Sequence, residues 1–173
     1  DLGNGMPKRC DIWRNAHDEL IMQSLDTSVI ENIKIVNARY FHEKSGSSIE
    51  LNYKIYGNGI LKIKQTLYPS GAENPELPRF GMKVSVNETF DNLEWFGRGP
   101  HESYWDRKTS AKIDRYKGKV IDQTYKYVRP QETGNKTDIR WLALYNGSIG
   151  LMVKGLPVFD GSVHHYDYAL LDY

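Results

Sequence analysis

The chain has 173 residues, of which 39% are hydrophobic and 26% are charged, a balance typical of a folded globular protein. Lysine and arginine total 23 and aspartate and glutamate total 22, so no net charge draws the chain toward nucleic acid or an anionic membrane. No apolar run approaches the roughly 18–20 residues that a membrane-spanning helix needs. The single cysteine, Cys10, excludes an intrachain disulfide and fits a reducing compartment without requiring one. We therefore expect neither nucleic acid nor membrane as a partner.

The N-terminal part predicts one short helix. Between residues 8 and 25, apolar side chains recur at spacings of one, three and four from Ile12 to Leu20, as on one face of a helix. From Val29 onward the period changes to two, which predicts a strand over residues 33–40.

The middle and the C-terminal part predict strands. Residues 49–55 and 61–67 alternate apolar with polar side chains on either side of Gly57-Asn58-Gly59, the pattern of a β-hairpin. A loop rich in proline, glycine and glutamate follows over residues 68–78. Further strands are predicted at 82–86, 93–95, 113–120, 139–145, 149–153 and 158–166, with a second hairpin turn at Asn146-Gly147. About nine strands with hydrophilic outer faces predict an all-β sandwich of antiparallel sheets with one short N-terminal helix.

Residues 95–108 form a segment unusually dense in aromatic, glycine and charged residues. Gly97 and Gly99 can adopt positive φ, and Pro100 fixes the next φ near −65°. The segment is typical of a strand end that runs into a rigid polar turn, which fits either contact with a sugar or a buried structural element.

Four aromatic residues could either fill the core or stack on a sugar. Trp95 and Trp141 lie within strand patterns, so we expect them in the core. Tyr104 and Trp105 are the candidates for stacking on a sugar, and Trp105, flanked by Tyr104 and Asp106, is the better surface candidate.

Glycoside hydrolysis uses two carboxylates about 5–10 Å apart. Two pairs of acids fit by residue type: Glu102 with Asp106, and Glu132 with Asp138. Acids in aromatic turns more often pair with a nearby arginine, and Arg107 and Arg140 are obvious partners. The structural interpretation of these acids is therefore favoured.

The sequence gives no support for a metal or thiol site. His164 and His165 are adjacent, so on a strand they face opposite sides of the sheet and do not easily bind one ion. No cluster of cysteine and histidine supplies the three or four ligands of a zinc site. Cys10 is expected to be a buried, inert thiol.

Four segments carry a family resemblance: residues 1–13, 77–82, 95–107 and 127–141. Residues 95–107 fit the pattern WxGxGPxExYxDR at every fixed position, and residues 127–141 fit YxxPQExGNxxDxRW. Over nearly its whole length the chain resembles the C-terminal region, called the small-chain or fifth domain, of bacterial β-galactosidases in glycoside hydrolase family 2.

The resemblance implies an antiparallel β-supersandwich similar to galactose-mutarotase folds, as one domain over residues 1–173. The family's domain usually continues past the position of Tyr173, so a C-terminally truncated fragment is implied. The whole enzyme would hydrolyse terminal non-reducing β-D-galactose residues. Its two catalytic glutamates belong to a separate upstream barrel domain, so no catalytic residue is expected in this chain, which would instead help to complete the carbohydrate cleft.

The resemblance also assigns roles to individual residues. A loop beside the galactose site would contain Asp1, Gly3 and Asn4. Six signature residues would hold neighbouring loops together: Glu102, Asp106, Arg107, Glu132, Asn135 and Arg140. No cofactor or metal is expected in this chain, because the magnesium and sodium of the parent enzyme would be bound mainly by the barrel.

The implied partners are the remaining domains of the parent β-galactosidase and, in the whole enzyme, its galactoside substrate. The parent would be a homo-oligomer in the bacterial cytoplasm or periplasm. Two alternatives stay open: a free-standing carbohydrate-binding module that uses Trp105 and Tyr104, and a mutarotase-like enzyme that uses one acid and one histidine from Glu132, His164 and His165.

Overall fold

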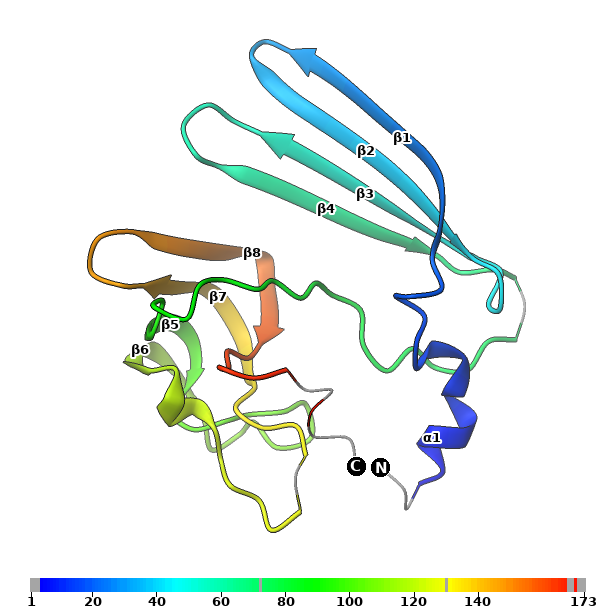
Figure 1. Cartoon of the computed structure of the whole chain (residues 1–173). Coiled ribbons are helices and arrows are strands. Elements are labelled where there is room, and N and C mark those ends of the chain that lie inside the picture. The colour runs from blue at the N-terminus through cyan, green and yellow to red at the C-terminus, as the bar shows by residue number, and fades with distance from the viewer. Residues whose placement is uncertain (1–3, 72, 130, 168–169, 171–173) are drawn as a thin grey trace. The chain divides into compact units, whose positions relative to one another are not determined.

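The computed structural model describes residues 4–71, 73–129, 131–167 and 170. The backbone forms two compact units, Asp1–Lys83 and Val84–Tyr173. Each unit contains one four-stranded antiparallel sheet (Figure 1). The predicted all-β antiparallel class with one short N-terminal helix is confirmed, while a single domain over residues 1–173 stays a prediction.

The first unit contains helix α1 (Met6–Arg9), the 3-10 turn η1 (Asp11–Trp13) and strands β1 (Ile21–Ile30), β2 (Ile33–His42), β3 (Ser47–Ile55) and β4 (Leu61–Tyr68). The second unit contains β5 (Asn92–Gly99), β6 (Lys112–Lys119), the 3-10 turn η2 (Ile121–Gln123), β7 (Lys136–Tyr145) and β8 (Gly150–Gly161). The strand order is β1-β2-β3-β4 in the first sheet and β6-β5-β7-β8 in the second. The described residues thus contain eight strands, where the sequence predicted about nine.

The N-terminal helix is much shorter than the periodicity of residues 8–25 predicts, so that prediction of its extent is wrong. Helix α1 ends at Arg9, and β1 begins at Ile21. Strand β1 pairs with β2 along its length, and the two-residue turn between them consists of Glu31 and Asn32, with φ of 50° and 66°. Positive φ at both central residues is the geometry of a type I′ hairpin, whose twist suits two antiparallel strands. Pairing between strands therefore overrides the local helical pattern.

The predicted hairpin around Gly57-Asn58-Gly59 is confirmed as β3 and β4. Side chains that pair in register share one face of a sheet, because successive residues alternate between faces. One face of the first sheet is largely apolar: Leu25, Val29, Val36, Ala38, Leu51, Tyr53, Ile55, Leu61 and Ile63. The opposite face carries mostly polar side chains: Asp26, Asn37, Asn52, Lys54, Lys62 and Lys64. The apolar face is exposed at its edge strands, where Val29 is 67% exposed.

The hydrophobic core of the second unit surrounds Trp95 on β5, the strand that pairs with both β6 and β7. The core consists of Leu93, Trp95, Val120, Ile139, Leu142 and Leu144. Trp95 is 1% exposed, and its Nε1 donates a hydrogen bond to the Arg98 carbonyl at 2.9 Å. Trp141 pairs with Phe96, is half-buried and does not belong to this core. The prediction that Trp141 is a core residue is therefore wrong.

Gly97 and Gly99 are needed for space and not for an unusual backbone conformation. Neither has positive φ, contrary to the expected use of these glycines. A Cβ atom at Gly99 would lie 2.7 Å from the Tyr116 ring and 2.9 Å from the Trp95 ring. A Cβ atom at Gly97 would lie 2.9 Å from the Cα of Ile139. The glycines of this segment therefore allow Trp95 and β7 to pack closely on β5.

Two further strand predictions differ from the structure. Residues 82–86 form no strand, because no described residue pairs with them in a ladder. Residues 150–161 form the one strand β8, where two strands were predicted; its register against β7 shifts, since Ile139 pairs with Phe159 but Trp141 pairs with Lys154. The loop predicted over residues 68–78 is confirmed for residues 69–71 and 73–78, while Tyr68 is the last residue of β4.

Candidate functional site

The Glu102 carboxylate is the centre of a polar cluster between the loop after β5 and the segment before β7. It accepts hydrogen bonds from the hydroxyl of Tyr127, from Nη2 of Arg107 at 3.0 Å, from Oγ1 of Thr133 at 3.1 Å and from the backbone N–H of Gly134 at 2.8 Å. Burial by itself raises the pKa of Glu102, but these donors together outweigh it and hold the pKa below its usual value. Glu102 is therefore an ionised anchor for three segments of the chain.

Arg107 closes a tight turn whose tip consists of Trp105 and Asp106. The backbones of Tyr104 and Arg107 form a bridge, with N–H to carbonyl distances of 3.5 and 3.0 Å. The Arg107 guanidinium lies 4.6 Å from the centroid of the Tyr104 ring and donates to the Tyr127 hydroxyl at 2.9 Å. The Tyr104 ring therefore supports the turn from within.

The Tyr104 hydroxyl is buried and has no hydrogen-bond partner among the described residues. Burial raises the pKa of Tyr104, and the charges of Glu102 and Glu132 raise it further. The tyrosine therefore stays neutral at physiological pH.

Ser103 fastens the same loop to the start of β7. Its backbone N–H donates to the Asn135 carbonyl at 2.8 Å, and the Asn135 side chain donates to the Ser103 carbonyl, also at 2.8 Å. The hydroxyl of Ser103 lies 2.9 Å from Thr137 Oγ1 and accepts the Thr137 backbone N–H at 3.0 Å. Ser103 and Thr137 are both fully buried.

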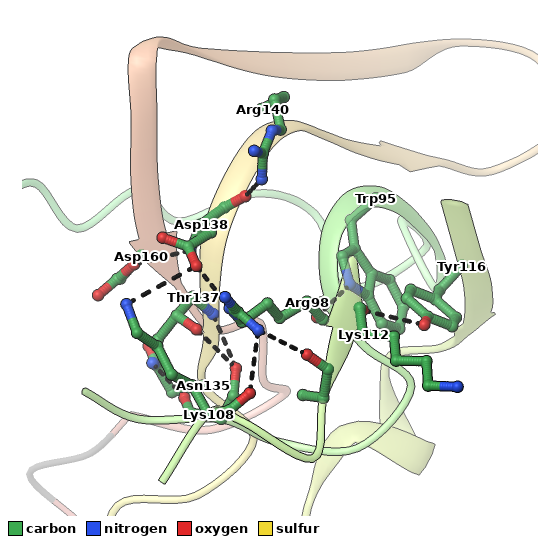
Figure 2. A network of polar contacts seen from close by, with 12 residues as sticks. Trp95, Arg98, Lys108, Lys112, Tyr116, Asn135, Thr137, Asp138, Arg140 and Asp160 are labelled. Atoms are coloured by element: carbon green, nitrogen blue, oxygen red, sulfur yellow. Dashed lines mark hydrogen bonds and ion pairs between the residues drawn. The ribbon is translucent and has the colours of Figure 1, made fainter. Parts of the chain in front are cut away.

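A second network joins β5 and β7 through Arg98 and Asp138, as Figure 2 shows. Arg98 Nε lies 2.5 Å from Asp138 Oδ2, and Nη1 of Arg98 donates to the carbonyls of Lys108 at 3.1 Å and Ala111 at 2.9 Å. The Arg98 hydrogen bond, opposed by burial and aided by the charge of Lys108, lowers the pKa of Asp138. Asp138 has a φ of 54°, in the left-handed region, and its carbonyl accepts from Arg140 Nη1 at 2.6 Å.

Trp105 stands out from this anchored surface because its side chain is 75% exposed. The ammonium of Lys108 lies 3.8 Å from the centroid of the Trp105 ring and 3.7 Å from Asp138 Oδ2. Asp106 is exposed, and none of the described residues donates to its carboxylate. The turn thus carries an exposed indole and an exposed carboxylate on consecutive residues.

The structure brings some of the predicted site residues together and leaves others apart. Glu102, Arg107 and Asn135 lie within the cluster, and Asp106 lies at the tip of its turn. The charge of Glu132 raises the pKa of Tyr104, so Glu132 lies in the same neighbourhood.

Of the loop predicted to lie beside the substrate, Asp1 and Gly3 are outside the described residues. Asn4 is exposed, and its side-chain oxygen accepts the backbone N–H of Met6 at 2.9 Å. The Asn4 carbonyl accepts from Arg9 Nη1 at 2.8 Å, so this residue is tied to the start of α1.

His164 and His165 contact different partners. His164 Nε2 lies 2.9 Å from the Thr133 carbonyl, and burial lowers the pKa of His164. His165 Nε2 lies 3.2 Å from Asp91 Oδ1. Across residues 4–71, 73–129, 131–167 and 170, no three histidine, cysteine or acidic side chains group as ligands of one metal ion. Within the same part of the chain, no helix has the length and apolarity to span a membrane.

Sequence reasoning missed Lys136, which is 3% exposed. Its Nζ donates to the Gly134 carbonyl at 3.2 Å and lies 5.2 Å from the Trp95 ring centroid. Burial lowers the pKa of Lys136 to about 8, although the charge of Glu102 opposes this. A lysine beside Gly134-Asn135 carries no sequence signal of burial, since lysine is among the residues most often exposed.

A serine–histidine–carboxylate arrangement in the first unit also escaped prediction. His42 is 2% exposed, with Nδ1 2.8 Å from Ser45 Oγ and Nε2 3.2 Å from Glu19 Oε2. Ser45 is itself buried, and its Oγ accepts the Ser47 backbone N–H at 3.3 Å. Because a nucleophile must reach its substrate, this arrangement serves to join loops and not to attack a bond.

The predicted site residues do not line either of two surface hollows among the described residues. One hollow is lined by Glu94, Arg115, Tyr116, Lys117 and Tyr145, and the other by Glu19, His42, Glu43 and Lys44. The hydrogen bonds around Glu102 make that cluster a junction between loops.

The sequence comparisons identify the family. All 173 residues match the model of the β-galactosidase small chain. The chain belongs to the β-galactosidase small-chain family. It is 42% identical over 161 residues to a β-galactosidase of Priestia megaterium. The matched region covers 92% of this chain but only 16% of that relative.

More distant relatives show the same proportions. The chain is 31% identical over 161 residues to a β-galactosidase of an Arthrobacter species, covering 90% of this chain and 16% of the relative. It is 30% identical over 155 residues to a β-galactosidase of Vibrio cholerae, covering 90% and 14%. The small-chain segment is thus a minor part of much longer proteins, and the predicted family membership is confirmed.

Proposed function

We propose that this chain is a non-catalytic domain of a β-galactosidase and helps to complete the carbohydrate cleft of the whole enzyme. The whole enzyme would hydrolyse terminal non-reducing β-D-galactose residues. One observation carries the proposal. All 173 residues match the small-chain family model, and 92% and 90% of the chain match only 16% of each of two proteins named β-galactosidase.

The state of the acids supports a structural role for the chain. A retaining glycosidase needs one carboxyl group with a raised pKa to donate a proton, and a second one as nucleophile. The pKa of Glu102 and that of Asp138 are both lowered, and each carboxylate is engaged by an arginine. The networks hold loops in place, which is what a cleft wall needs from a supporting domain.

The proposal carries the remaining family expectations with it. The partners would be the other domains of the parent β-galactosidase, its galactoside substrate, and further copies of the parent in a homo-oligomer. Magnesium and sodium would be bound mainly outside this chain.

A graft tests the proposal. The segment of the Priestia megaterium β-galactosidase that matches this chain is replaced by the chain, and hydrolysis of a chromogenic β-galactoside is measured. We expect turnover within about tenfold of the parent enzyme, because two segments that are 42% identical over 161 residues share one fold, and none from the 173-residue chain alone. Efficient turnover by the chain alone, abolished by Glu102→Gln, would contradict the proposal. An equally well-folded graft without activity would contradict it too.

One observation favours the mutarotase-like alternative: burial lowers the pKa of His164 but the charge of Glu132 opposes this shift, so an acid and a histidine lie near each other. Polarimetry of freshly dissolved α-D-galactose decides the matter. The proposal predicts no acceleration by the chain, whereas acceleration that disappears in Glu132→Gln would establish the alternative.

A further inference from the structure

We propose that the turn over residues 104–107 is a saccharide-contact site, in which Trp105 stacks on a pyranose ring, Asp106 accepts hydrogen bonds from its hydroxyls, and Lys108 positions the indole. This inference deepens the proposed function, on which it rests, because it names the residues of this domain that would touch carbohydrate. The ligand class is an uncharged β-galactoside.

The turn is rigid before any ligand arrives. Its ends are joined by the backbone bridge between Tyr104 and Arg107, and Arg107 is held in turn by Glu102 at 3.0 Å. A single exposed aromatic residue is ordinary on protein surfaces. An exposed aromatic residue on a turn that is held at both ends is different. The fold already orders the turn, so a ligand loses less conformational entropy on binding.

Lys108 fixes the orientation of Trp105. Its ammonium lies 3.8 Å from the ring centroid, the geometry of a cation–π contact. The same ammonium lies 3.7 Å from the Asp138 carboxylate, and the Lys108 carbonyl accepts from Arg98 (Figure 2). Since Lys108 covers one ring face while Trp105 stays 75% exposed, the opposite face is the accessible one.

The chemistry at the tip selects an uncharged sugar. The C–H bonds at C3, C4 and C5 of β-galactose point to one side of the ring, because O4 is axial on the other, and this apolar side suits the negative face of an indole. A carboxylate accepts hydrogen bonds from two neighbouring hydroxyls, and Asp106 is exposed with no donor among the described residues. Its charge disfavours an anionic ligand, and the nearby Lys108 is already engaged by Asp138.

The expected affinity is modest. The contact area is one ring face and one carboxylate on an open surface, and a ligand of monosaccharide size then binds with roughly millimolar affinity. Saturation-transfer difference NMR detects this range.

The test uses the full 173-residue chain and methyl β-D-galactopyranoside. We expect saturation strongest at H3, H4 and H5, a loss of affinity of about tenfold or more in Trp105→Ala, and a loss of several-fold in Asp106→Asn. Trp141→Phe is the matched control, because it removes another indole that has a cation, here Arg115, over its ring, and the variant should bind as the unmodified chain does. Dispersed amide spectra verify that each variant is folded.

The positioning role of Lys108 is tested by a measurement that a purely structural residue would leave unchanged. In Lys108→Met the 15N order parameter of the Trp105 indole should fall and the dissociation constant should rise a few-fold, whereas Lys108→Arg should restore both. Absence of saturation in the folded chain, or equal saturation in Trp105→Ala, would overturn the inference. Either result leaves the graft experiment untouched, so failure of this site and failure of the domain's proposed role are separable.

Discussion

At the scale of the residue, burial and hydrogen bonding decide what each ionisable side chain can do. Glu102 is an acid within the family signature over residues 95–107. Four hydrogen-bond donors surround its carboxylate and lower its pKa. Lys136 shows the opposite case, because a cation in an apolar setting has its pKa lowered toward neutrality. Both effects make the stability of the fold depend on pH.

Glu102→Gln should lower the free energy of unfolding by about 2–4 kcal/mol at pH 7, because an amide accepts fewer charge-assisted bonds and brings two donors against existing donors. Urea denaturation measures the loss, with the exposed Glu88→Gln as control. Because the pKa of Glu102 is lowered in the folded chain, the stability that it contributes is present at neutral pH and lost as the pH falls below about 4.5. An equal change in both variants would refute this assignment.

Lys136 should make the chain more stable as the pH rises from about 8 to 10.5, the ordinary pKa of lysine. In that window the unfolded state keeps a proton that the folded state has released, so the free energy of unfolding increases with pH. Relative to Lys136→Met, the unmodified chain should gain about 2–3 kcal/mol across the window. Urea midpoints at several pH values measure the difference, and parallel pH profiles for the two proteins would disprove the burial of this cation.

At the scale of the element, the loops around β5 and β7 are held by specific geometry more than by regular structure. Gly134 has a φ of +73°, and a Cβ atom there would lie 2.3 Å from the Gln123 carbonyl oxygen. Gly147, in the hairpin before β8, also has positive φ, but open space surrounds it. Comparing the two glycines therefore separates the cost of positive φ, which both share, from the cost of a steric clash, which only Gly134 has.

Gly134→Ala should cost more than about 3 kcal/mol, since positive φ and a backbone clash act together. Gly147→Ala should cost only about 1–2 kcal/mol, because the clash is missing. Thermal unfolding of the two variants provides the comparison. Similar costs would mean that Gln123 moves aside without penalty.

Arg98 is the other fastening between β5 and β7, and its planar guanidinium serves three acceptors at once. Arg98→Lys keeps the charge but cannot reach the same acceptors, so we expect a loss of about 1–3 kcal/mol. The exposed Arg14→Lys is the control, since its contact with Asp11 is on the surface. Urea denaturation of both variants tests whether geometry or charge alone matters here.

For the whole molecule, the apolar sheet face of the first unit matters: in that unit taken by itself, the side chains of this face are exposed on β1 and β4. Contiguous exposed apolar surface binds other apolar molecules in water. The chain should therefore enhance the fluorescence of the dye ANS while folded. Leu25→Lys with Val29→Lys should reduce the enhancement at least about twofold by breaking this surface. Ser24→Lys with Ser28→Lys adds the same two charges on the opposite face and should leave it unchanged; equal fluorescence of the two double variants would contradict the assignment of faces.

The all-β class, the hairpin at Gly57-Asn58-Gly59, the burial of Trp95 and the family could be predicted from the residues alone, because alternation, turn chemistry and signature spacing are local properties. Three features became known only from the folded chain: residues 21–30 pair as a strand, Gly99 makes room for two rings, and Lys136 is buried. Each of these depends on which distant segment lies opposite, and a ladder partner, a steric limit or a low dielectric environment leaves no mark in the neighbouring residues.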